Sequence, residues 1–331
     1  MGTPPLPVGR FAPSPTGDLH LGSALAALAA WASVRNQDGR FVWRVEDLDG
    51  PRTVPGAAER QMEDAQWLGI DWDHGPDPAH PQLDVGPHGP YRQSERSAFY
   101  DAALRQLADA NRLFPCRRSR KDLKALATAP HGASGLPPYP PSWRPDALAP
   151  GWLDALGDRP DCALRFRVDD DPVTFEDRVV GWVTEDVRET VGDVVLKRRD
   201  GVYAYQLAVV VDDLAMGVTE VVRGQDLLDS TARQILLIRA LGGVVPGYAH
   251  LPLLVNTEGE KLSKRDAAPT IRALRQRGVA PETVVGWLAH QLGQTDSASS
   301  LTALELADRW DWKSVRPEPI AVHDELATTL T

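Results

Sequence analysis

The first 46 residues alternate between segments that favour different backbone conformations. A short apolar run at 8–12 leads into the turn cluster Pro-Ser-Pro-Thr-Gly, and an Ala- and Leu-rich segment at 20–31 predicts a helix. A second apolar run at 40–46 predicts another strand. A strand, a turn, a helix and a strand in this order form a βαβ unit, whose two strands lie parallel in one sheet. The chain is therefore predicted to be an α/β protein.

The size and composition of the chain are those of an ordinary globular protein. Its 331 residues predict about two domains, and 42% of them are hydrophobic and 25% charged. Two cysteines exclude a disulfide framework and a four-cysteine zinc site. The sequence has no apolar run of about 18 residues, and its N-terminus lacks the apolar core of an export signal. We therefore expect a cytoplasmic protein that does not enter a membrane.

The charge balance is acidic, with 36 basic and 46 acidic residues and a net charge of −10. This balance excludes a uniformly basic nucleic-acid-binding protein but not a local basic patch, because phosphate contacts need local cations. Two segments could form such a local basic patch, and each is either an RNA contact or an ordinary solvated surface. They are the run of Arg117, Arg118, Arg120, Lys121 and Lys124, and the run Lys197-Arg198-Arg199.

Apolar patterning continues through most of the chain and predicts further helices and strands. Helices are expected at 56–68, 94–113, 230–241, 270–276 and 281–292, and short strands at 162–168, 173–175, 179–183 and 191–197. A long apolar strand is expected at 203–211, before Asp212 and Asp213. The proline-rich stretch 130–150 predicts a long irregular loop.

The turn between the first strand and the first helix carries a candidate anion site. The helix begins at His20, Gly22 and Ser23, and a helix N-terminus presents N–H groups and a partial positive charge to an anion. Gly22 allows a planar ring or a phosphate to approach the backbone, and His20 can hydrogen-bond a phosphate oxygen. The ordinary alternative is a helix cap with an exposed histidine.

A second candidate lies about 240 residues later, in the segment Glu260-Lys261-Leu262-Ser263-Lys264-Arg265. Its three cations suit a loop that closes on a triphosphate, because ammonium groups can neutralise charge that develops on phosphorus and on a leaving pyrophosphate. Taken alone, it also fits a solvated basic surface loop.

Together the two motifs resemble the paired signatures of class I aminoacyl-tRNA synthetases. His20-Leu-Gly-Ser stands in place of the tetrapeptide HIGH, and Lys261-Leu-Ser-Lys-Arg in place of KMSKS. The segments RFAPSPTG at 10–17, WRVEDLD at 43–49 and VRG at 222–224 resemble the glutamyl branch of this class. More narrowly, the chain resembles the glutamyl-Q tRNA(Asp) synthetases over 8–295, through YAYQLAVVVDD at 203–213, GVTEVVRGQDLLDSTARQ at 217–234 and HLPL at 250–253.

The resemblance implies a fold and a division of the chain. We expect a Rossmann-type parallel-sheet catalytic core, an inserted α+β domain of the acceptor-binding type and a short helical C-terminal part. The core would comprise 8–93 and 200–245, the insertion 94–199, and the lysine loop with the helical part 246–331. Only 67 residues (331 − 264) follow Lys264, so we expect no anticodon-binding domain.

The resemblance also implies roles for individual residues. Arg10 and Arg223 are expected to bind carboxylates, and Glu46 the ammonium group, of glutamate. A surface ion pair is the ordinary alternative for either arginine. For Glu46, the alternative is a cation-binding cluster formed with Asp47 and Asp49. The full glutamate set comprises Arg10, Phe11, Ala12, Pro13, Ser14, Glu46, Tyr205 and Arg223. The ATP set comprises His20, Gly22, Ser23, Lys261 and Lys264, of which His20, Lys261 and Lys264 are the expected catalytic residues.

The implied reaction is ATP-dependent activation of L-glutamate and its transfer to the queuosine base in the anticodon of tRNA(Asp). No protein nucleophile is needed, because the glutamate carboxylate attacks the α-phosphorus of ATP while the protein positions the reactants and stabilises charge. Magnesium normally accompanies ATP in such chemistry, and no dedicated protein magnesium site is expected. The expected partners are glutamate, ATP and queuosine-containing tRNA(Asp), and a monomer is expected.

Two departures from the family pattern are present. Ser23 replaces the final histidine of HIGH, as the glutamyl branch often shows. Better-known members carry a zinc cluster of the form Cys-x-Cys…Tyr-x-x-x-Cys, of which only Cys116 and Tyr139 remain here, since Arg118 and Trp143 replace two thiolates. One thiolate and one phenol cannot form a closed tetrahedral zinc site. We therefore predict no zinc and no other metal ligand set, with Cys116 buried as a small hydrophobic residue.

Three other interpretations share part of this pattern. A truncated form of an ordinary glutamyl-tRNA synthetase would share the motifs. Ordinary members of that group are much longer, because they add an anticodon-binding region. A nucleotidyltransferase with a similar histidine motif and lysine loop would lack the set Arg10, Glu46 and Arg223. A non-catalytic synthetase-like RNA-binding module would not need intact His20, Lys261 and Lys264.

Overall fold

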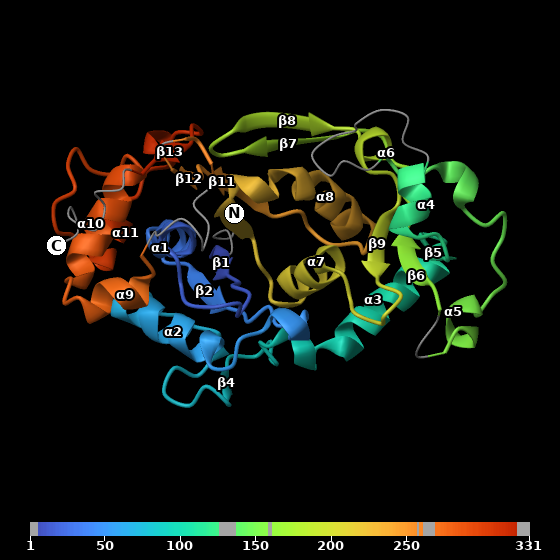
Figure 1. Cartoon of the computed structure of the whole chain (residues 1–331), viewed down its shortest axis with the longest axis horizontal. Helices are drawn as coiled ribbons and strands as arrows, with labels where there is room; N and C mark the ends of the chain where they lie inside the picture. Colours follow the sequence, from blue (N-terminus) through green and yellow to red (C-terminus); the bar gives the residue numbers. More distant parts are fainter. Residues whose placement is uncertain (1–5, 126–136, 158–160, 257, 261–268, 323–331) are drawn as a thin grey trace, which may run out of the picture.

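The computed structural model of the chain describes residues 6–125, 137–157, 161–256, 258–260 and 269–322. Figure 1 shows a central sheet with helices on both sides, the C-terminal helices at one end of the molecule and the segment around β5 and β6 at the other. No helix within these ranges is long and apolar enough to cross a membrane.

The central sheet has six strands in the order β2-β1-β10-β11-β7-β8. The first five run parallel and β8 pairs antiparallel with β7. The predicted βαβ unit is confirmed, because β1 and β2 are parallel neighbours with Gly9 opposite Phe41. The strands are β1 (Val8–Phe11), β2 (Arg40–Trp43), β7 (Val173–Asp177), β8 (Gly181–Glu185), β10 (Glu220–Gly224) and β11 (Gly247–Leu251).

Two hydrophobic clusters cover the two faces of this sheet. Side chains alternate across a strand, so Val221 of β10 joins one cluster and its neighbour Val222 the other. The Val222 side holds α1 (Leu21–Arg35), α2 (Ala57–Trp67), α9 (Ile271–Gln276), α10 (Pro281–Gln291) and α11 (Ala303–Asp308). The Val221 side holds α3 (Ser97–Asp109), α7 (Tyr205–Ala215) and α8 (Thr231–Ala240).

Helix α1 is buried on nearly all sides between the sheet and α11. Its small side chains permit this, and Ala27, Ala29 and Ala30 are fully buried. The strand beneath it is equally restricted, because a methyl group on Gly9 would lie 2.7 Å from Cγ1 of Val34. Close packing therefore fixes the position of the α1 N-terminus relative to β1.

A separate antiparallel sheet, in the order β5-β6-β9, forms the centre of the insertion. The expected inserted α+β part is thus present, together with the parallel core. Strands β7 and β8 belong to the range 94–199 by sequence, yet they extend the central sheet. The elements of the insertion are β5 (Leu113–Cys116), α4 (Arg120–Ala125), α5 (Trp152–Ala155), β6 (Ala163–Phe166), α6 (Val187–Thr190) and β9 (Val194–Lys197).

Smaller elements complete the described chain. The short strands are β3 (Gly75–Pro76), β4 (Asp84–Val85), β12 (Leu254–Val255) and β13 (Ile320–Ala321). The 3-10 helices are η1 (Gly50–Arg52), η2 (Gln93–Glu95), η3 (Pro141–Trp143), η4 (Gln225–Ser230) and η5 (Trp312–Ser314).

The structure corrects several expected elements. The apolar run 203–211 is not a strand but lies largely in helix α7, because a continuous apolar run fits a buried helix as well as a buried strand. The helix expected at 94–113 ends at Asp109 and is followed by β5. Strands β10 and β11 and helix α11 were not predicted. The loop expected at 130–150 lies partly outside the described residues, and its part 137–150 contains only η3.

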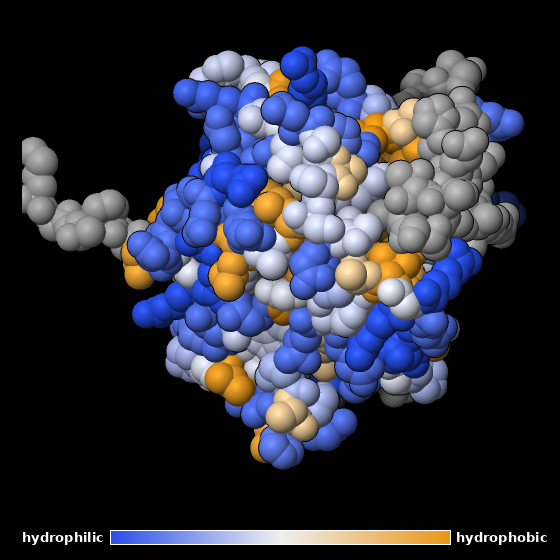
Figure 2. Space-filling view, turned by 90° about the vertical axis from the view of Figure 1, so that its left-hand side faces the viewer, coloured by the Kyte–Doolittle hydropathy of each residue, from blue (hydrophilic) through white to orange (hydrophobic). Residues whose placement is uncertain are grey.

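The surface over the C-terminal helices is mostly hydrophilic. Figure 2 shows this side, with hydrophobic residues in small, separate patches. Single exposed apolar residues, such as Leu304 of α11, are normal on a globular protein.

Candidate active site

The candidate site lies where the parallel strands of the central sheet end. β1, β2, β10 and β11 end at Phe11, Trp43, Gly224 and Leu251, and ligands of parallel α/β sheets bind at this carboxyl edge. Several of the predicted glutamate-binding residues belong to this edge. They are Arg10 and Phe11 in β1, Ala12, Pro13 and Ser14 after it, Glu46 after β2 and Arg223 in β10.

Arg10 is buried at this edge, with 4% of its surface exposed. Its Nη1 donates to the carbonyl oxygen of Val222 at 3.0 Å, and its Nε lies 3.5 Å from Oδ2 of Asp213. Phe11 is also buried, whereas Ser14 is exposed. The segment after β1 is tied to the segment after β2, because Glu46 N donates to the carbonyl oxygen of Pro13 at 3.0 Å.

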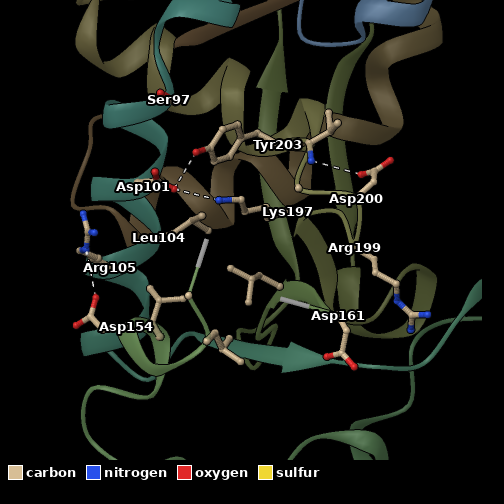
Figure 3. Close-up of a pocket in the computed structure, with 16 residues that line it drawn as sticks. Ser97, Asp101, Leu104, Arg105, Asp154, Asp161, Lys197, Arg199, Asp200 and Tyr203 are labelled. Carbon is tan, nitrogen blue, oxygen red and sulfur yellow. Dashed lines mark hydrogen bonds and ion pairs between the residues drawn. The ribbon is translucent and has the colours of Figure 1, made fainter. Parts of the chain in front are cut away.

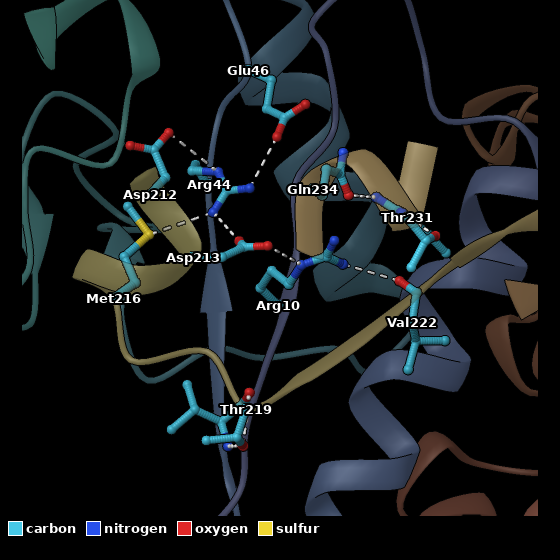
Figure 4. Close-up of polar contacts among 12 residues, drawn as sticks. Arg10, Arg44, Glu46, Asp212, Asp213, Met216, Thr219, Val222, Thr231 and Gln234 are labelled. Carbon is cyan, nitrogen blue, oxygen red and sulfur yellow. Dashed lines mark hydrogen bonds and ion pairs between the residues drawn. The ribbon is translucent and has the colours of Figure 1, made fainter. Parts of the chain in front are cut away.

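Arg10 and Glu46 are joined through two buried charges (Figure 4). Arg44, which is fully buried, donates from Nη1 to Oδ1 of Asp213 at 2.6 Å and from Nη2 to Oε1 of Glu46 at 3.0 Å. Glu46, Arg44, Asp213 and Arg10 therefore form a line of alternating charge, which we call the charge line. Arg44 Nε also lies 3.8 Å from Asp212.

The charge line sets the ionisation of its carboxylates. Burial raises the pKa of Glu46, and Arg44 acts in the opposite direction. Burial alone would also raise the pKa of Asp213, but Arg44 and Arg10 outweigh it and leave this pKa below its usual value. Asp213 thus stays ionised between the two arginines, while the charge of Glu46 depends on Arg44.

Arg223 is held by a second buried network. Its Nε donates to Nε2 of His250 at 3.0 Å, its Nη1 to Gln234 Oε1 at 2.8 Å and its Nη2 to Thr231 Oγ1 at 2.8 Å. The hydroxyl of Tyr205, a partly exposed residue, lies 3.5 Å from Arg223 Nη1. The structure therefore brings Tyr205 and Arg223 together, and Val222, the neighbour of Arg223, contacts Arg10.

The α1 N-terminus holds the expected nucleotide-binding residues that the structure describes. His20 is the N-cap residue, and Gly22 and Ser23 in the first turn are exposed. A side chain at Gly22 would meet nothing within 4 Å, so the space above its backbone is open. Thr270 pairs with His20, and Ile271 N donates to the carbonyl oxygen of Leu19 at 2.8 Å. Lys261 and Lys264 lie outside the described residues.

The acidic neighbours of Glu46 have other partners. Asp47 accepts hydrogen bonds from the N–H and the hydroxyl of Ser94, at 2.8 Å and 2.7 Å. Asp49 lies 3.9 Å from Arg52 on the surface. Among the described residues, no group of three or more His, Cys, Asp or Glu side chains could hold a metal ion.

The residues at the family's zinc position still meet, but as a different cluster. Cys116 Sγ lies 3.3 Å from the hydroxyl of Tyr139, and both side chains are buried. The guanidinium of Arg118 lies 5.0 Å from the ring of Trp143, and the Tyr139 and Trp143 rings meet edge to face at 5.5 Å. This set of one thiol, one phenol, a cation and an indole does not fit a tetrahedral zinc ion. Absence of zinc remains a prediction.

The two basic segments, which are either RNA contacts or ordinary solvated surface, are partly engaged within the chain. Arg117 pairs with Asp161 at 3.1 Å, and Arg199 donates to the carbonyl oxygen of Arg117 at 2.5 Å. Arg198 pairs with Asp200 at 2.5 Å. Lys121 and Lys124 are exposed, and the side chain of Arg120 is not described. These contacts leave the RNA role of the segments a prediction.

Lys197 lines a cleft of about 1050 Å³ between α3, α5 and the end of β9 (Figure 3). Its Nζ lies 3.3 Å from Oδ1 of Asp101, which also accepts from the hydroxyl of Tyr203 at 2.8 Å. None of the described glutamate-site residues lines this cleft.

The sequence interpretation missed several residues of the site. Arg44, Asp213, His250 and Asp177 hold the expected ligand-binding residues. The first three stand in segments that carry the family resemblance, but no role was expected of them. Asp177 Oδ2 lies 2.6 Å from Nδ1 of His250. The available signal was indirect: charged residues at 44, 212 and 213 lie next to apolar runs that predict buried elements.

Comparisons with known proteins identify the family of the chain. The family model described as "tRNA synthetases class I (E and Q), catalytic domain" matches residues 8–324. A glutamyl-Q tRNA(Asp) synthetase of Symbiobacterium thermophilum is 46% identical over 98% of this chain and 98% of its own length. Those of Rhodopirellula baltica and Geobacter sulfurreducens are 41% and 48% identical, over 97% and 82% of this chain and 98% and 80% of their own lengths.

A solved structure has the same fold. The glutamate-tRNA synthetase of Elizabethkingia anophelis matches with a TM-score of 0.82 and 28% identity, over 97% of this chain and 69% of that chain. The expected α/β class and the enzyme class are thereby confirmed. The chain belongs to the class I tRNA synthetases of the E and Q group, a family of ligases, within the branch of the glutamyl-Q tRNA(Asp) synthetases.

Proposed function

We propose that the chain activates L-glutamate with ATP and transfers it to the queuosine base in the anticodon of tRNA(Asp). The observation that carries the amino-acid part is the match of charges at the sheet edge. Glutamate has two carboxylates and one ammonium group, and the edge presents two buried arginines, Arg10 and Arg223, with one carboxylate, Glu46. The RNA part is supported by the relatives, which bear this name.

In this proposal each arginine binds one carboxylate of glutamate. Arg223 has five N–H donors. The donor on Nε bonds to His250, one donor on Nη1 bonds to Gln234, and one donor on Nη2 bonds to Thr231. A carboxylate bound end-on to both terminal nitrogens would replace the long contact between Arg223 and Tyr205. Glu46 binds the ammonium group, and the segment Phe11 to Ser14 lies against the substrate through Ala12, Pro13 and the Ser14 hydroxyl.

The chemical step needs no protein nucleophile. A carboxylate oxygen of glutamate attacks the α-phosphorus of ATP, the new O–P bond forms and the bond to pyrophosphate breaks. An acceptor group of the queuosine base then attacks the acyl carbon, and AMP leaves. The site contributes by holding the reactants and by stabilising charge.

His20, Gly22, Ser23, Lys261 and Lys264 form the proposed phosphate side of the site, with magnesium bound to ATP rather than to a protein cage. The open space above Gly22 and the partial positive charge at the α1 N-terminus support this placement. Thr270, six residues after Lys264, pairs with His20, and six residues span at most about 20 Å. This short tether supports the proposal that the lysines act at the same phosphates as His20.

The remaining parts of the proposal concern organisation. The core at 8–93 and 200–245, extended by β7 and β8, acts on glutamate and ATP. The rest of the insertion at 94–199 contacts RNA, and 246–331 supplies the lysine loop. We propose a monomer that acts in the cytoplasm, where tRNA is found.

Two assays test the function. Glutamate-dependent ATP–pyrophosphate exchange should occur without any tRNA. Glutamate should then be transferred to queuosine-containing tRNA(Asp) and not to tRNA(Asp) that lacks queuosine. Equal acylation of the two tRNAs would contradict the RNA assignment, and exchange that requires tRNA would favour an ordinary glutamyl-tRNA synthetase. Lack of exchange under both conditions would favour a non-catalytic RNA-binding module.

A further inference from the structure

Three neighbouring strands place a buried acid, a histidine and an arginine in one line. In β10 and β11, Arg223 lies directly opposite His250, and the last residue of β7, Asp177, pairs with Tyr248, two residues before His250. His250 and the side chain of Asp177 are fully buried. Asp177 Oδ2 contacts His250 Nδ1 at 2.6 Å, and His250 Nε2 contacts Arg223 Nε at 3.0 Å.

The chemistry of these atoms fixes where the proton of His250 lies. The Nε of an arginine can only donate, so His250 Nε2 must accept and carry no proton. The ring is therefore neutral and carries its proton on Nδ1, from which it donates to Asp177. Thr231 agrees with this assignment, because its hydroxyl accepts from Arg223 Nη2 and lies 3.2 Å from His250 Nε2, to which it can donate.

Asp177 is in turn held firmly in this orientation. Its Oδ1 accepts from the backbone N–H groups of Val179 and Val180 at 3.0 Å each and of His250 at 3.2 Å. Only Oδ2 is thus available to the imidazole ring. Burial lowers the pKa of His250 although Asp177 acts in the opposite direction, which agrees with a neutral ring.

We propose that Asp177 and His250 are positioning residues, which hold the guanidinium of Arg223 in the orientation that receives a carboxylate of glutamate. This inference rests on the proposed function. Asp177 selects the histidine tautomer, the tautomer supplies an acceptor to Arg223 Nε, and the Nε contact directs the two terminal nitrogens towards the substrate. Neither Asp177 nor His250 contacts glutamate in this arrangement.

The decisive variant is D177N. The three backbone donors keep the amide oxygen of the new side chain at the Oδ1 position, so its NH2 group faces His250 Nδ1. A donor at that point moves the histidine proton to Nε2, where it opposes the N–H of Arg223. We expect the KM for glutamate in ATP–pyrophosphate exchange to rise about 10- to 100-fold, because small displacements of a binding group have effects of this size. The KM for ATP should stay within about 2-fold.

A second substitution separates positioning from simple structural support. In H250Q, the side-chain carbonyl oxygen can still accept from Arg223 Nε, and no tautomer remains for Asp177 to select. We expect H250Q to raise the KM for glutamate less than D177N does. In D177N/H250Q, the Asp177 change should add less than about 3-fold to the effect of H250Q, since coupled residues are not additive.

The matched control is D193N, since Asp193 is another buried carboxylate and bonds to Arg144 and to Val168 N, away from Arg223. D193N should leave the KM for glutamate unchanged, with a thermal melt recorded for every variant. The inference is overturned if D177N leaves this KM unchanged, if it raises the KM for ATP equally, or if the two changes are additive in the double variant. Lack of exchange in the unaltered protein would overturn the proposed function, and this inference with it.

Discussion

Loss of the Arg44 charge is predicted to destabilise the core. It is fully buried and contacts Asp213 at 2.6 Å and Glu46 at 3.0 Å, with Asp212 at 3.8 Å. The variant R44M keeps most of the side-chain volume but removes the ion pair of Glu46 and leaves Asp213 with Arg10 at 3.5 Å. Removing one partner of a buried ion pair costs about 3–5 kcal/mol, because the remaining charge stays desolvated.

The same variant should also impair glutamate binding. Arg44 opposes the upward effect of burial on the pKa of Glu46, so its loss favours the protonated acid, which cannot hold an ammonium group by charge. We therefore expect a lower midpoint of urea-induced unfolding, as monitored by tryptophan fluorescence. We also expect a raised KM for glutamate in ATP–pyrophosphate exchange.

The matched control is R52M. The side chain of Arg52 is 74% exposed and lies 3.9 Å from Asp49, and such surface pairs contribute roughly 0–1 kcal/mol. A loss of less than about 1 kcal/mol in R44M, similar to that in R52M, would refute the reasoning, since it would mean that the buried carboxylates do not depend on Arg44.

Three further outcomes are expected. E46Q should raise the KM for glutamate at least about 10-fold with little change for ATP, as loss of a charged hydrogen-bond partner costs about 1.5–3 kcal/mol; an unchanged KM would remove Glu46 from the site. Treatment with a zinc chelator should leave the thermal melt and the activity unchanged, and elemental analysis that finds one zinc per chain would contradict this. The pKa values of Asp177 and Asp213 lie below their usual range, so their contribution to stability is present above the unfolded pKa of about 4 and is lost as the pH falls through the folded values. A urea concentration at the unfolding midpoint that does not decrease when the pH is lowered from about 5 to about 3 would contradict this assignment.

The order of the first elements could be predicted because local signals and tertiary structure agree there. The turn cluster after β1 and the small residues of α1 are both visible in the sequence, and β1 and β2 pair as expected. The run 203–211 was misassigned because it is almost continuously apolar and buried from Leu207 onwards, so neither a period of 2 nor one of 3.6 appears in it. Strands β10 and β11 were missed because short apolar segments have no distinct signature outside their sheet.

The site could be predicted only where a family motif exists. Arg10, Glu46 and Arg223 were named from the resemblance, and the structure brings them to one sheet edge. The residues that hold them, such as Asp213 and His250, depend on contacts between segments far apart in the chain. Arg44 and Asp213, for example, are 169 residues apart. Such pairings follow from the folded sheet and cannot be derived from spacing.

The order of strands in the central sheet has a consequence for synthesis on the ribosome. Strand β1 lies between β2 and β10, and 211 residues separate Val8 from its partner Thr219. At about 5–20 residues per second, the β10-facing edge of β1 waits roughly 10–40 seconds for its neighbour to be translated. An unpaired strand edge can join another chain during that time. The yield of active protein should therefore depend on translation speed and on chaperone supply, and the vulnerable part is strand β1.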